Sequence, residues 1–318
     1  MDTTSHDFQW DIHTIGQYGT EIFDVAYVAD DNVWIVGEIA TDEQDYNAAH
    51  WDGHVWEIFE IWGITPINGI QYFSDNDIWV VGGFPFHWDG NEWTLYHLED
   101  MGITEGGLHG QIWGSSPNDI HFIGYDGLAV HYDGIEFEVK ETGTDIRLRD
   151  IAGSPDGEHV FAVGFENHGL YSIALEYVNG EWQTIYYSES PFLPNSEYGK
   201  VNSVFVRDNS AYFATRAGLL QYNYLTGELN LHEIDPFSIE FVQITRCNSA
   251  GPNDVFLVTN NYKLYHYNGD NWILNSYIDE YFGDDAWTRG ADMFEDKIAV
   301  VGHWAVQTGV IAFGSREF

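Results

Sequence analysis

One short pattern recurs seven times along this chain of 318 residues. It is an apolar run that ends in glycine or threonine, and it is clearest at residues 33–37 (VWIVG), 78–82 (IWVVG) and 120–124 (IHFIG). The four weaker copies lie at residues 160–164, 211–215, 255–259 and 298–302. Successive copies end 45, 42, 40, 51, 44 and 43 residues apart. A period of about 40–45 residues with several short strands in each repeat is typical of the blades of a β-propeller.

The second repeat shows what one unit contains. An alternating apolar stretch at residues 67–74 precedes the core run at 78–82, and residues 86–88 (FHW), an Asp-Gly turn at 89–90 and an alternating stretch at 92–98 follow. Asp-Gly between two apolar runs is a strong hairpin signal, because both residues tolerate positive φ. Each repeat is therefore predicted to form four antiparallel strands, and no stretch sustains a helical period.

The last repeat lacks an outer strand, which the N-terminus is predicted to supply. Residues 287–314 provide three strands, whereas residues 8–15 resemble the outermost strands elsewhere. Such closure removes the open sheet edges that promote aggregation. The prediction is an all-β, seven-bladed β-propeller with four antiparallel strands per blade, in a single domain of residues 1–318. After a tail at residues 1–7 and the strand at 8–15, the blades are predicted at residues 20–61, 66–98, 108–142, 147–187, 200–234, 240–277 and 287–314.

The charge of the chain restricts its partners. It carries 51 acidic and 11 basic residues, a formal net charge of −40. Such a surface repels nucleic acid and anionic membranes, so neither is expected as a partner. Strong acidity favours a high-salt habitat, where ions screen the self-repulsion, and cation binding by carboxylates is the alternative. The single cysteine, Cys247, excludes an internal disulfide, and no apolar run approaches the ~18 residues of a membrane span.

Two motifs resemble a known group of proteins. WGSSPNDI at residues 113–120 and HYDG at residues 131–134 resemble secreted bacterial propellers that repeat WGSSPNDIWxVG and HWDGxxW units and are often exported as lipoproteins. The resemblance covers all seven repeats and carries no catalytic motif. It implies an extracellular or cell-surface location, with a signal or lipid-anchor segment removed ahead of residue 1. The stretch at residues 2–4 (DTT) is similar to the tail that follows the lipid-modified cysteine in such proteins.

Four histidines occupy one slot of the repeat, directly before the aromatic residue of the third strand. They are His50, His87, His131 and His266. They belong to different blades, whereas a zinc ion needs its ligands at about 2.0–2.1 Å. A hydrogen bond to a neighbouring strand explains the pattern, so no metal site and no cofactor are predicted. Calcium held weakly by the acidic loop at residues 41–46, or by Asp279 and Glu280 with Asp284 and Asp285, is the alternative.

The long connections are predicted to emerge on one face of the propeller, at the mouth of its central channel. They span residues 38–47, 165–172, 187–200, 275–286 and 303–308. Function concentrates on such variable loops on a rigid scaffold. Six of the eleven cations map to this face: Arg147, Arg149, Lys200, Arg216, Lys263 and Arg289.

Cations gathered on so acidic a protein indicate a pocket for a carboxylate, sulfate or phosphate. Alignment of the first strands places Arg149 and Arg289 at one equivalent position, and the predicted ligand-binding residues are Arg149, Arg289, Arg216, Asn68, Asn202 and His303. The alternative is that each arginine pairs with a nearby acid, such as Arg149 with Asp150 or Arg289 with Asp292.

These features favour a non-enzymatic extracellular module that binds an anionic or glycan ligand, or a peptide or protein partner, at the channel mouth. No nucleophile elbow, phosphate loop or carboxylate pair can be selected by spacing, so no catalytic residue is predicted. Two alternatives stay open. One is a polysaccharide lyase or glycosidase that uses acids with His303 or His168 at the same face, and the other is a structural subunit of an extracellular assembly.

The net charge of −40 generates a salt prediction. We expect the melting temperature to rise as ionic strength approaches about 1 M, where the screening length falls to ~3 Å. Thermal unfolding in sodium chloride from low to molar concentration measures the effect. A melting temperature that falls or stays flat contradicts adaptation to high salt, and stabilisation by millimolar calcium alone indicates specific cation sites.

Overall fold

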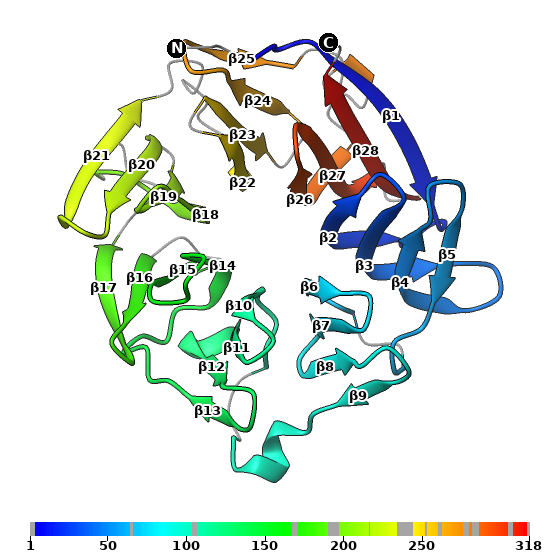
Figure 1. The fold of residues 1–318 in the computed structure, drawn as a ribbon, viewed down its shortest axis with the longest axis horizontal. Coiled ribbons are helices and arrows are strands. Elements are labelled where there is room, and N and C mark those ends of the chain that lie inside the picture. Colours follow the sequence, from blue (N-terminus) through cyan, green and yellow to red (C-terminus); the bar gives the residue numbers. More distant parts are fainter. Residues whose placement is uncertain are drawn as a thin grey trace. The chain divides into compact units, whose positions relative to one another are not determined.

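Seven four-stranded antiparallel sheets make up the protein, which is a seven-bladed β-propeller (Figure 1). In six of the sheets the strands follow one another in chain order, and each sheet is one blade. The structure is a computed structural model that describes the chain apart from residues 1–3, 64–65, 104–106, 167–170, 190–196, 216, 234–243, 252, 260–262, 276–279, 282–285, 305–307 and 317–318. The described residues contain no helix with the length and apolar character that a membrane span requires.

The chain forms two compact units, and the first holds residues 1–70 and 239–318. Blade 1 of this unit consists of β2 (Glu21–Ala29), β3 (Asn32–Ala40), β4 (Asp45–Trp51) and β5 (Trp56–Phe59). Blade 6 consists of β22 (Ile244–Gly251), β23 (Asp254–Thr259), β24 (Leu264–Tyr267) and β25 (Trp272–Leu274). Blade 7 consists of β26 (Ala286–Phe294), β27 (Lys297–Trp304), β28 (Thr308–Arg316) and β1 (Phe8–Ile15).

The second unit, residues 71–238, holds blades 2 to 5. Blade 2 consists of β6 (Gly69–Ser74), whose first two residues belong to the first unit, β7 (Asp77–Val81), β8 (Pro85–Trp88) and β9 (Trp93–Leu95). Blade 3 consists of β10 (Ile112–Ser116), β11 (Asp119–Ile123), β12 (Ala129–Tyr132) and β13 (Phe137–Val139). Blade 4 consists of β14 (Leu148–Gly153), β15 (Val160–Phe165), β16 (Ser172–Val178) and β17 (Glu181–Ser188). Blade 5 consists of β18 (Val201–Arg207), β19 (Ser210–Thr215), β20 (Gly218–Asn223) and β21 (Glu228–Glu233). Two short 3₁₀ helices, η1 (Leu98–Met101) and η2 (Tyr125–Gly127), lie in the connections.

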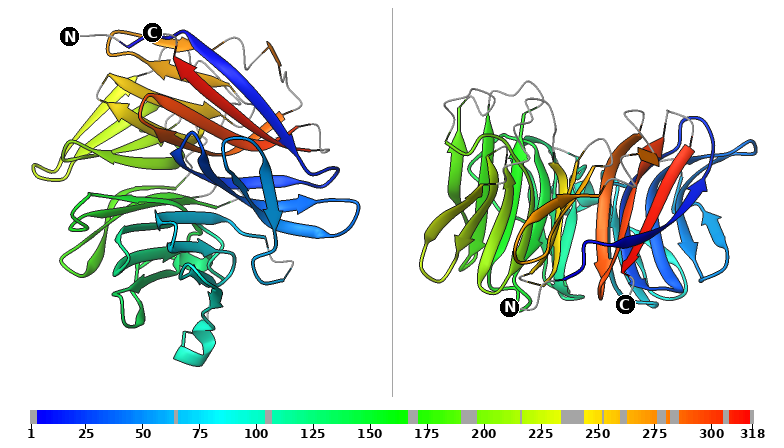
Figure 2. Two further views of the ribbon diagram at one scale, coloured as in Figure 1. Left: turned by 45° about the vertical axis from the view of Figure 1, so that its right-hand side comes forward. Right: turned by 90° about the horizontal axis from the view of Figure 1, so that it is seen from above.

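The N-terminal strand completes blade 7, as the sequence predicts. β1 pairs antiparallel with β28 from Phe8 opposite Arg316 to Ile15 opposite Gly309. The two strands lie side by side in Figure 1 and in the left-hand view of Figure 2, although they come from opposite ends of the chain. Gly314 makes room for the ring of Trp10, since a Cβ atom there would lie 2.7 Å from two ring carbons. The outer edge of β28 is therefore covered by a strand from the opposite end of the chain.

The predicted Asp-Gly turns precede the outer strands of the first three blades. Gly53, Gly90 and Gly134 adopt φ values of 89°, 90° and 90°, a conformation that a side chain disfavours. The aspartate before each glycine accepts two backbone N–H groups of its own turn, and for Asp52 both distances are 2.8 Å. These N–H groups lower the pKa of Asp52, because they stabilise the ionised carboxylate. In each Asp-Gly pair the glycine thus supplies the positive φ of the turn, and the aspartate supplies a carboxylate that accepts the N–H groups of the turn.

Buried carboxylates tie neighbouring blades together. Asp150 of blade 4 accepts the hydroxyl of Ser203 at 2.5 Å and the backbone N–H of Val204 at 3.0 Å, both in blade 5. Asp292 of blade 7 accepts the N–H of Tyr27 in blade 1 at 2.9 Å. Burial raises the pKa of Asp292 to about 6, although backbone N–H groups oppose the shift. Such carboxylates stabilise the contact between blades at a cost in desolvation.

Deletion of residues 1–15 tests the closure of blade 7. We expect a lower melting temperature and aggregation, because the deletion leaves the backbone of β28 without its partner strand. Thermal unfolding and light scattering measure both effects. The variant Gln9→Ala, which removes an exposed side chain but keeps the strand, serves as the control and should behave as the parent protein. A truncated protein that stays monomeric with an unchanged melting temperature contradicts the role of β1.

Asp292 generates a prediction on pH. Its folded-state pKa of about 6 lies above the unfolded value of 3.8, so the folded state binds the proton more tightly and stability falls as pH rises through this window. The substitution Asp292→Asn removes the titrating group and therefore this loss of stability. The difference in free energy of unfolding between the variant and the parent protein should increase in favour of the variant by on the order of 1 kcal/mol from pH 5 to pH 8. Urea titrations at both pH values measure it. Glu57→Gln, at an exposed position, is the control, and an Asp292→Asn difference that is the same at both pH values contradicts the assignment.

Candidate functional site

Three of the residues predicted from the sequence stand at the same structural position, a β-bulge near the start of the first strand of a blade. The pairing shifts by one residue at Arg149 in β14, at Asn202 in β18 and at Arg289 in β26. A bulge interrupts the alternation of side chains and redirects the residue that it contains. The strand pairing thus shows that these three residues occupy equivalent positions. At each of them the regular alternation of side chains between the two faces of the sheet is interrupted.

In the unit of blades 2 to 5, Arg149 is one of three cations that lie together. Arg147 directly precedes β14, and Lys200 directly precedes the neighbouring strand β18. The two arginines are half-buried, and Lys200 is only 4% exposed. We call Arg147, Arg149 and Lys200 the cation cluster. It lies at the edge of the blades where β14 and β18 begin and where β15 ends, because adjacent strands are antiparallel.

Aromatic rings support all three cations. The guanidinium carbon of Arg149 lies 3.9 Å from the ring centroid of Phe165, and Nζ of Lys200 lies 3.4 Å from the same centroid. Arg147 lies over Tyr125 at 4.3 Å and donates from Nη2 to the backbone oxygen of His109 at 2.8 Å. Contacts of this kind stabilise a cation without neutralising it, since a ring has no net charge. The rings therefore favour the charged form of side chains that are partly removed from water.

Burial and neighbouring cations oppose the charged form of residues in the cation cluster, while Tyr125 acts in the other direction on Arg149. Burial, and then the charge of Arg147, lower the pKa of Arg149 to about 10. Burial, and then the charge of Arg149, lower the pKa of Lys200 to about 7. Nε of Arg147 is buried and has no hydrogen-bond partner among the described residues. This arrangement suits an anion, which would relieve the repulsion and accept charge-assisted hydrogen bonds.

Arg289 has different surroundings in the other unit. Its Nη2 donates to Oε2 of Glu21 in blade 1 at 2.9 Å, and its side chain is 41% exposed. His303 lies nearby and is buried, with Nδ1 unpartnered among the described residues. Burial lowers the pKa of His303, while Glu21 opposes the shift and Arg289 adds to it. At this site a carboxylate already accompanies the arginine, and it is Glu21 of the adjacent blade, not the Asp292 that the sequence suggests.

The other predicted residues are distributed over both units. Asn68 precedes β6 and Asn202 lies in β18, and both are half-buried. Arg216 and His168 lie outside the described residues. Arg149 and Arg289 belong to the two separately described units, so a joint site formed by both arginines stays a prediction.

Sequence reasoning placed Arg147 and Lys200 on the loop face but left them out of the predicted site. Their position next to the first strands was the available signal, because each directly precedes the strand of its blade. No sequence signal marked Phe165, whose role depends on the two cations that meet at its ring.

The repeated histidines form a hydrogen-bonded framework, as predicted. Each bonds through Nε2 to a carboxylate or amide oxygen at the start of the second strand of its own blade. The pairs are His50 with Asn32 at 3.0 Å, His87 with Asp77 at 3.0 Å, His131 with Asp119 at 2.8 Å and His266 with Asp254 at 2.9 Å. In blades 1 and 2 a tryptophan N–H donates to the same oxygen.

Blade 3 varies this framework, because His121 occupies the place of the tryptophan. Asp119, His121 and His131 bring three potential metal-ligand atoms within 4.8 Å of one another. The two imidazoles are stacked, with ring centroids 4.4 Å apart and planes inclined by 19°, and both point Nε2 at Oδ1 of Asp119. Burial opposes ionisation of Asp119, but hydrogen bonds from the two histidines and Ser115 hold its pKa well below the usual value. Because both Nε2 atoms lie within 3.4 Å of the same carboxylate oxygen, hydrogen bonding to Asp119 accounts for the arrangement.

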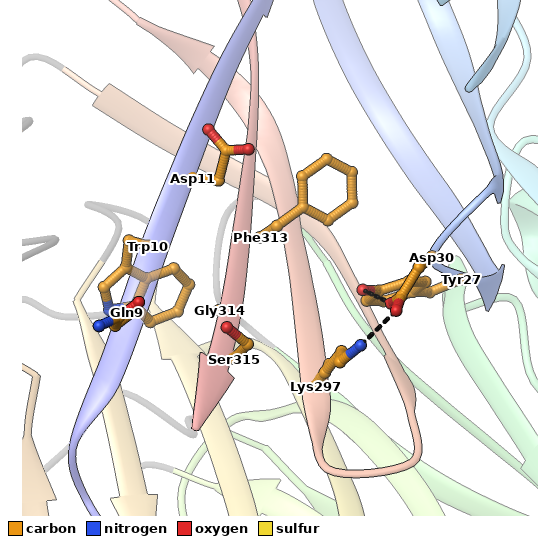
Figure 3. Close-up of a pocket in the computed structure, with 9 residues that line it drawn as sticks. All are labelled: Gln9, Trp10, Asp11, Tyr27, Asp30, Lys297, Phe313, Gly314 and Ser315. Carbon is orange, nitrogen blue, oxygen red and sulfur yellow. Dashed lines mark hydrogen bonds and ion pairs between the residues drawn. The ribbon is translucent and has the colours of Figure 1, made fainter. Parts of the chain in front are cut away.

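Among the described residues of the unit that holds blades 6, 7 and 1, we consider a pair of cavities. One, of about 260 Å³, opens beside β1 and β28 (Figure 3). At its rim Nζ of Lys297 lies 2.5 Å from Oδ2 of Asp30, which also accepts the hydroxyl of Tyr27 through Oδ1. The other, of about 300 Å³, is bordered by Tyr18, Glu38, Asp45 and Tyr46. Burial, and then the charges of Glu21 and Asp45, raise the pKa of Glu38. The cation of the first cavity, Lys297, is paired with a carboxylate, and the second cavity is bordered by the carboxylates of Glu38 and Asp45. Neither cavity therefore resembles the cation cluster.

Comparison with known proteins establishes the fold and no family. No protein-family model matches the chain, and no curated protein matches it. The chain is similar to a solved structure described as YCF48 bound to D1 peptide, with 15% identity, a TM-score of 0.73 and coverage of 100% of this chain and 99% of the other. YCF48 from Cyanidioschyzon merolae is 14% identical, with a TM-score of 0.66 and coverage of 95% and 98%. The WD40 β-propeller domain of Doa1 is 12% identical, with a TM-score of 0.64 and coverage of 97% of each chain.

Proposed function

We propose that this protein is a non-enzymatic binding module that takes a carboxylate-bearing peptide or protein segment at the cation cluster. One observation supports the proposal most. In a chain with a net charge of −40, three of eleven cations lie together on aromatic rings, and the charges that lower the pKa of Arg149 and Lys200 are those of their cationic neighbours. An anion bound beside these cations would lower the repulsion between their like charges.

The anion that fits is a carboxylate or a group of similar size. Arginine presents a planar fork of N–H donors that matches the two oxygens of a carboxylate, and Arg147 has a buried Nε without a partner among the described residues. The rings of Tyr125 and Phe165 lie against the cations and provide apolar surface beside them. A peptide segment combines carboxylates with apolar side chains, so it matches both parts of the site.

The comparison with solved propellers supports a peptide as the ligand class. The structure of YCF48 that this chain resembles over its whole length contains a bound peptide. A propeller positions loops and strand ends from several blades around one ligand, which suits recognition of an extended segment. The extracellular or cell-surface location is proposed from the repeated sequence units alone, and a glycan ligand is the competing class.

Isothermal titration with a glutamate hexapeptide at 0.15 M salt tests the proposal. Arg149→Ala should weaken binding tenfold or more, because each charge-assisted hydrogen bond contributes about 1.5–3 kcal/mol. Arg289→Ala is the matched control, since Arg289 stands at the same bulge but already pairs with Glu21. Its affinity should equal that of the parent.

Two outcomes contradict the proposal. If the parent protein does not bind the peptide at any salt concentration, the cation cluster is not a carboxylate site. If Arg149→Ala and Arg289→Ala weaken binding equally, the ligand depends on both arginines, and the cluster alone does not explain recognition.

A further inference from the structure

The residues directly ahead of β1 reach from blade 7 to blade 6. Oγ1 of Thr4 donates to the backbone oxygen of Asn253 at 2.7 Å, and the N–H of Thr4 donates to the backbone oxygen of Asn268 at 3.3 Å. Both acceptors lie in turns of blade 6, since Asn253 stands between β22 and β23 and Asn268 between β24 and β25. We call residues 4–7 the tail segment. It adds a contact with blade 6 to the pairing that β1 makes within blade 7.

His6 joins the tail segment to a buried histidine of blade 6. Its Nδ1 lies 2.9 Å from Nδ1 of His266, and its Nε2 lies 3.1 Å from Oδ1 of Asn271. His266 is 2% exposed, with the uncharged ring of Phe256 stacked on it at 4.6 Å and that of Phe8 edge-on at 5.4 Å. A nitrogen–nitrogen distance of 2.9 Å is a hydrogen bond, in which one imidazole donates an N–H and the other accepts it.

The other nitrogen of His266 decides which imidazole accepts. Nε2 of His266 lies 2.9 Å from Oδ1 of Asp254, and Nη2 of Arg316 donates to the same oxygen. Burial opposes ionisation of Asp254, but hydrogen bonds from His266 and Arg316 lower the pKa of this carboxyl. The charged carboxylate only accepts, so Nε2 of His266 carries a proton. In the neutral ring Nδ1 then presents a lone pair, and His6 donates to it.

This network leaves no place for a further proton on His266. Protonation of its Nδ1 would direct an N–H at the N–H of His6 and add a charge close to Arg316. Burial lowers the pKa of His266, Asp254 opposes the shift, and His6 and Arg316 add to it. His6 itself accommodates a proton, because a second N–H at Nε2 donates to Oδ1 of Asn271. The contact between the two histidines thus requires a neutral His266.

We propose that the tail segment is a pH-dependent clasp, which joins blade 7 to blade 6 while His266 is neutral and is released when both imidazoles are protonated. The docked state excludes a proton that the released state binds. Docking is therefore favoured at neutral pH and is lost as the pH falls below about 6.5, the usual pKa of a histidine side chain. The pairing of β1 with β28 does not use these contacts, so release frees residues 4–7 and leaves blade 7 closed.

The clasp is separate from the proposed function. It belongs to the unit of blades 6, 7 and 1, whereas the cation cluster belongs to the unit of blades 2 to 5. The test of either proposal therefore leaves the other unaffected.

Hydrogen exchange of the Thr4 amide, measured by NMR, tests the inference because this N–H is bonded to blade 6. At each pH the exchange rate in the unfolded chain is divided by the rate in the native protein, which removes the intrinsic effect of pH. Relative to the amides of β1 that pair with β28, this protection should fall at least tenfold from pH 7.5 to pH 5.0. The physical reason is the loss of the hydrogen bond between the two imidazoles and the repulsion between their charges.

Variants at position 6 separate titration from simple contact. His6→Asn keeps a side-chain amide near the place of Nδ1, and an amide can donate to a neutral His266 or accept from a charged one. Protection of Thr4 in this variant should differ by less than threefold between the two pH values. His6→Ala should lower the protection at pH 7.5 at least tenfold. His54→Ala, at an exposed histidine in a turn of blade 1, is the matched control and should behave as the parent protein.

Three outcomes overturn the clasp. Equal protection of Thr4 at the two pH values in the parent protein shows that protonation does not release the tail segment. A fall in His6→Asn as large as that in the parent protein shows that another group titrates. Unchanged protection in His6→Ala at pH 7.5 shows that the contact with His266 does not hold the tail segment in place.

Discussion

A four-stranded blade has two apolar faces and cannot bury either of them alone, and this constraint governs the structure. Aliphatic side chains of one blade pack against those of the next, as in the cluster that joins Phe161 and Val163 of blade 4 to Val204 and Phe213 of blade 5. Repeat proteins are stabilised by such neighbour contacts, which is why one pattern recurs at a nearly constant period. Each polar side chain buried between two blades then needs its own hydrogen-bond partners. Asp150 and Asp292 accept hydrogen bonds from backbone N–H groups of the neighbouring blade.

The β-bulge shows how a uniform scaffold acquires a local site. The pairing shift recurs in the first strands of several blades, but the residue that it redirects differs, with Arg149, Asn202 and Arg289 as examples. The same backbone device therefore presents a neutral amide in one blade and a guanidinium in another. Because packing depends on the flanking residues, the redirected side chain is free to vary without loss of the fold.

The fold could be predicted from the sequence because period, turns and alternation are local properties. The Asp-Gly turns, the histidine slot and the strand at residues 8–15 all follow from spacing, and the structure contains each of them. The site could not be predicted in the same way. Spacing identified Arg149 and Arg289 as equivalent but did not reveal that one lies among cations and the other beside Glu21. Glu21 and Lys200 come from neighbouring blades, and their effects on the two arginines depend on distances that a repeat pattern does not encode.

Completion of blade 7 by strands from opposite ends of the chain has a consequence for biosynthesis. β1 leaves the ribosome first, yet β28, its partner, ends at Arg316. At about 5–20 residues per second, the first strand waits roughly 15–60 s for its partner to be translated. During that interval it is an unpaired strand with a tryptophan and two isoleucines, beside a growing series of sheets. Vectorial synthesis thus leaves the last blade as the step at which a nascent chain can pair with the wrong molecule.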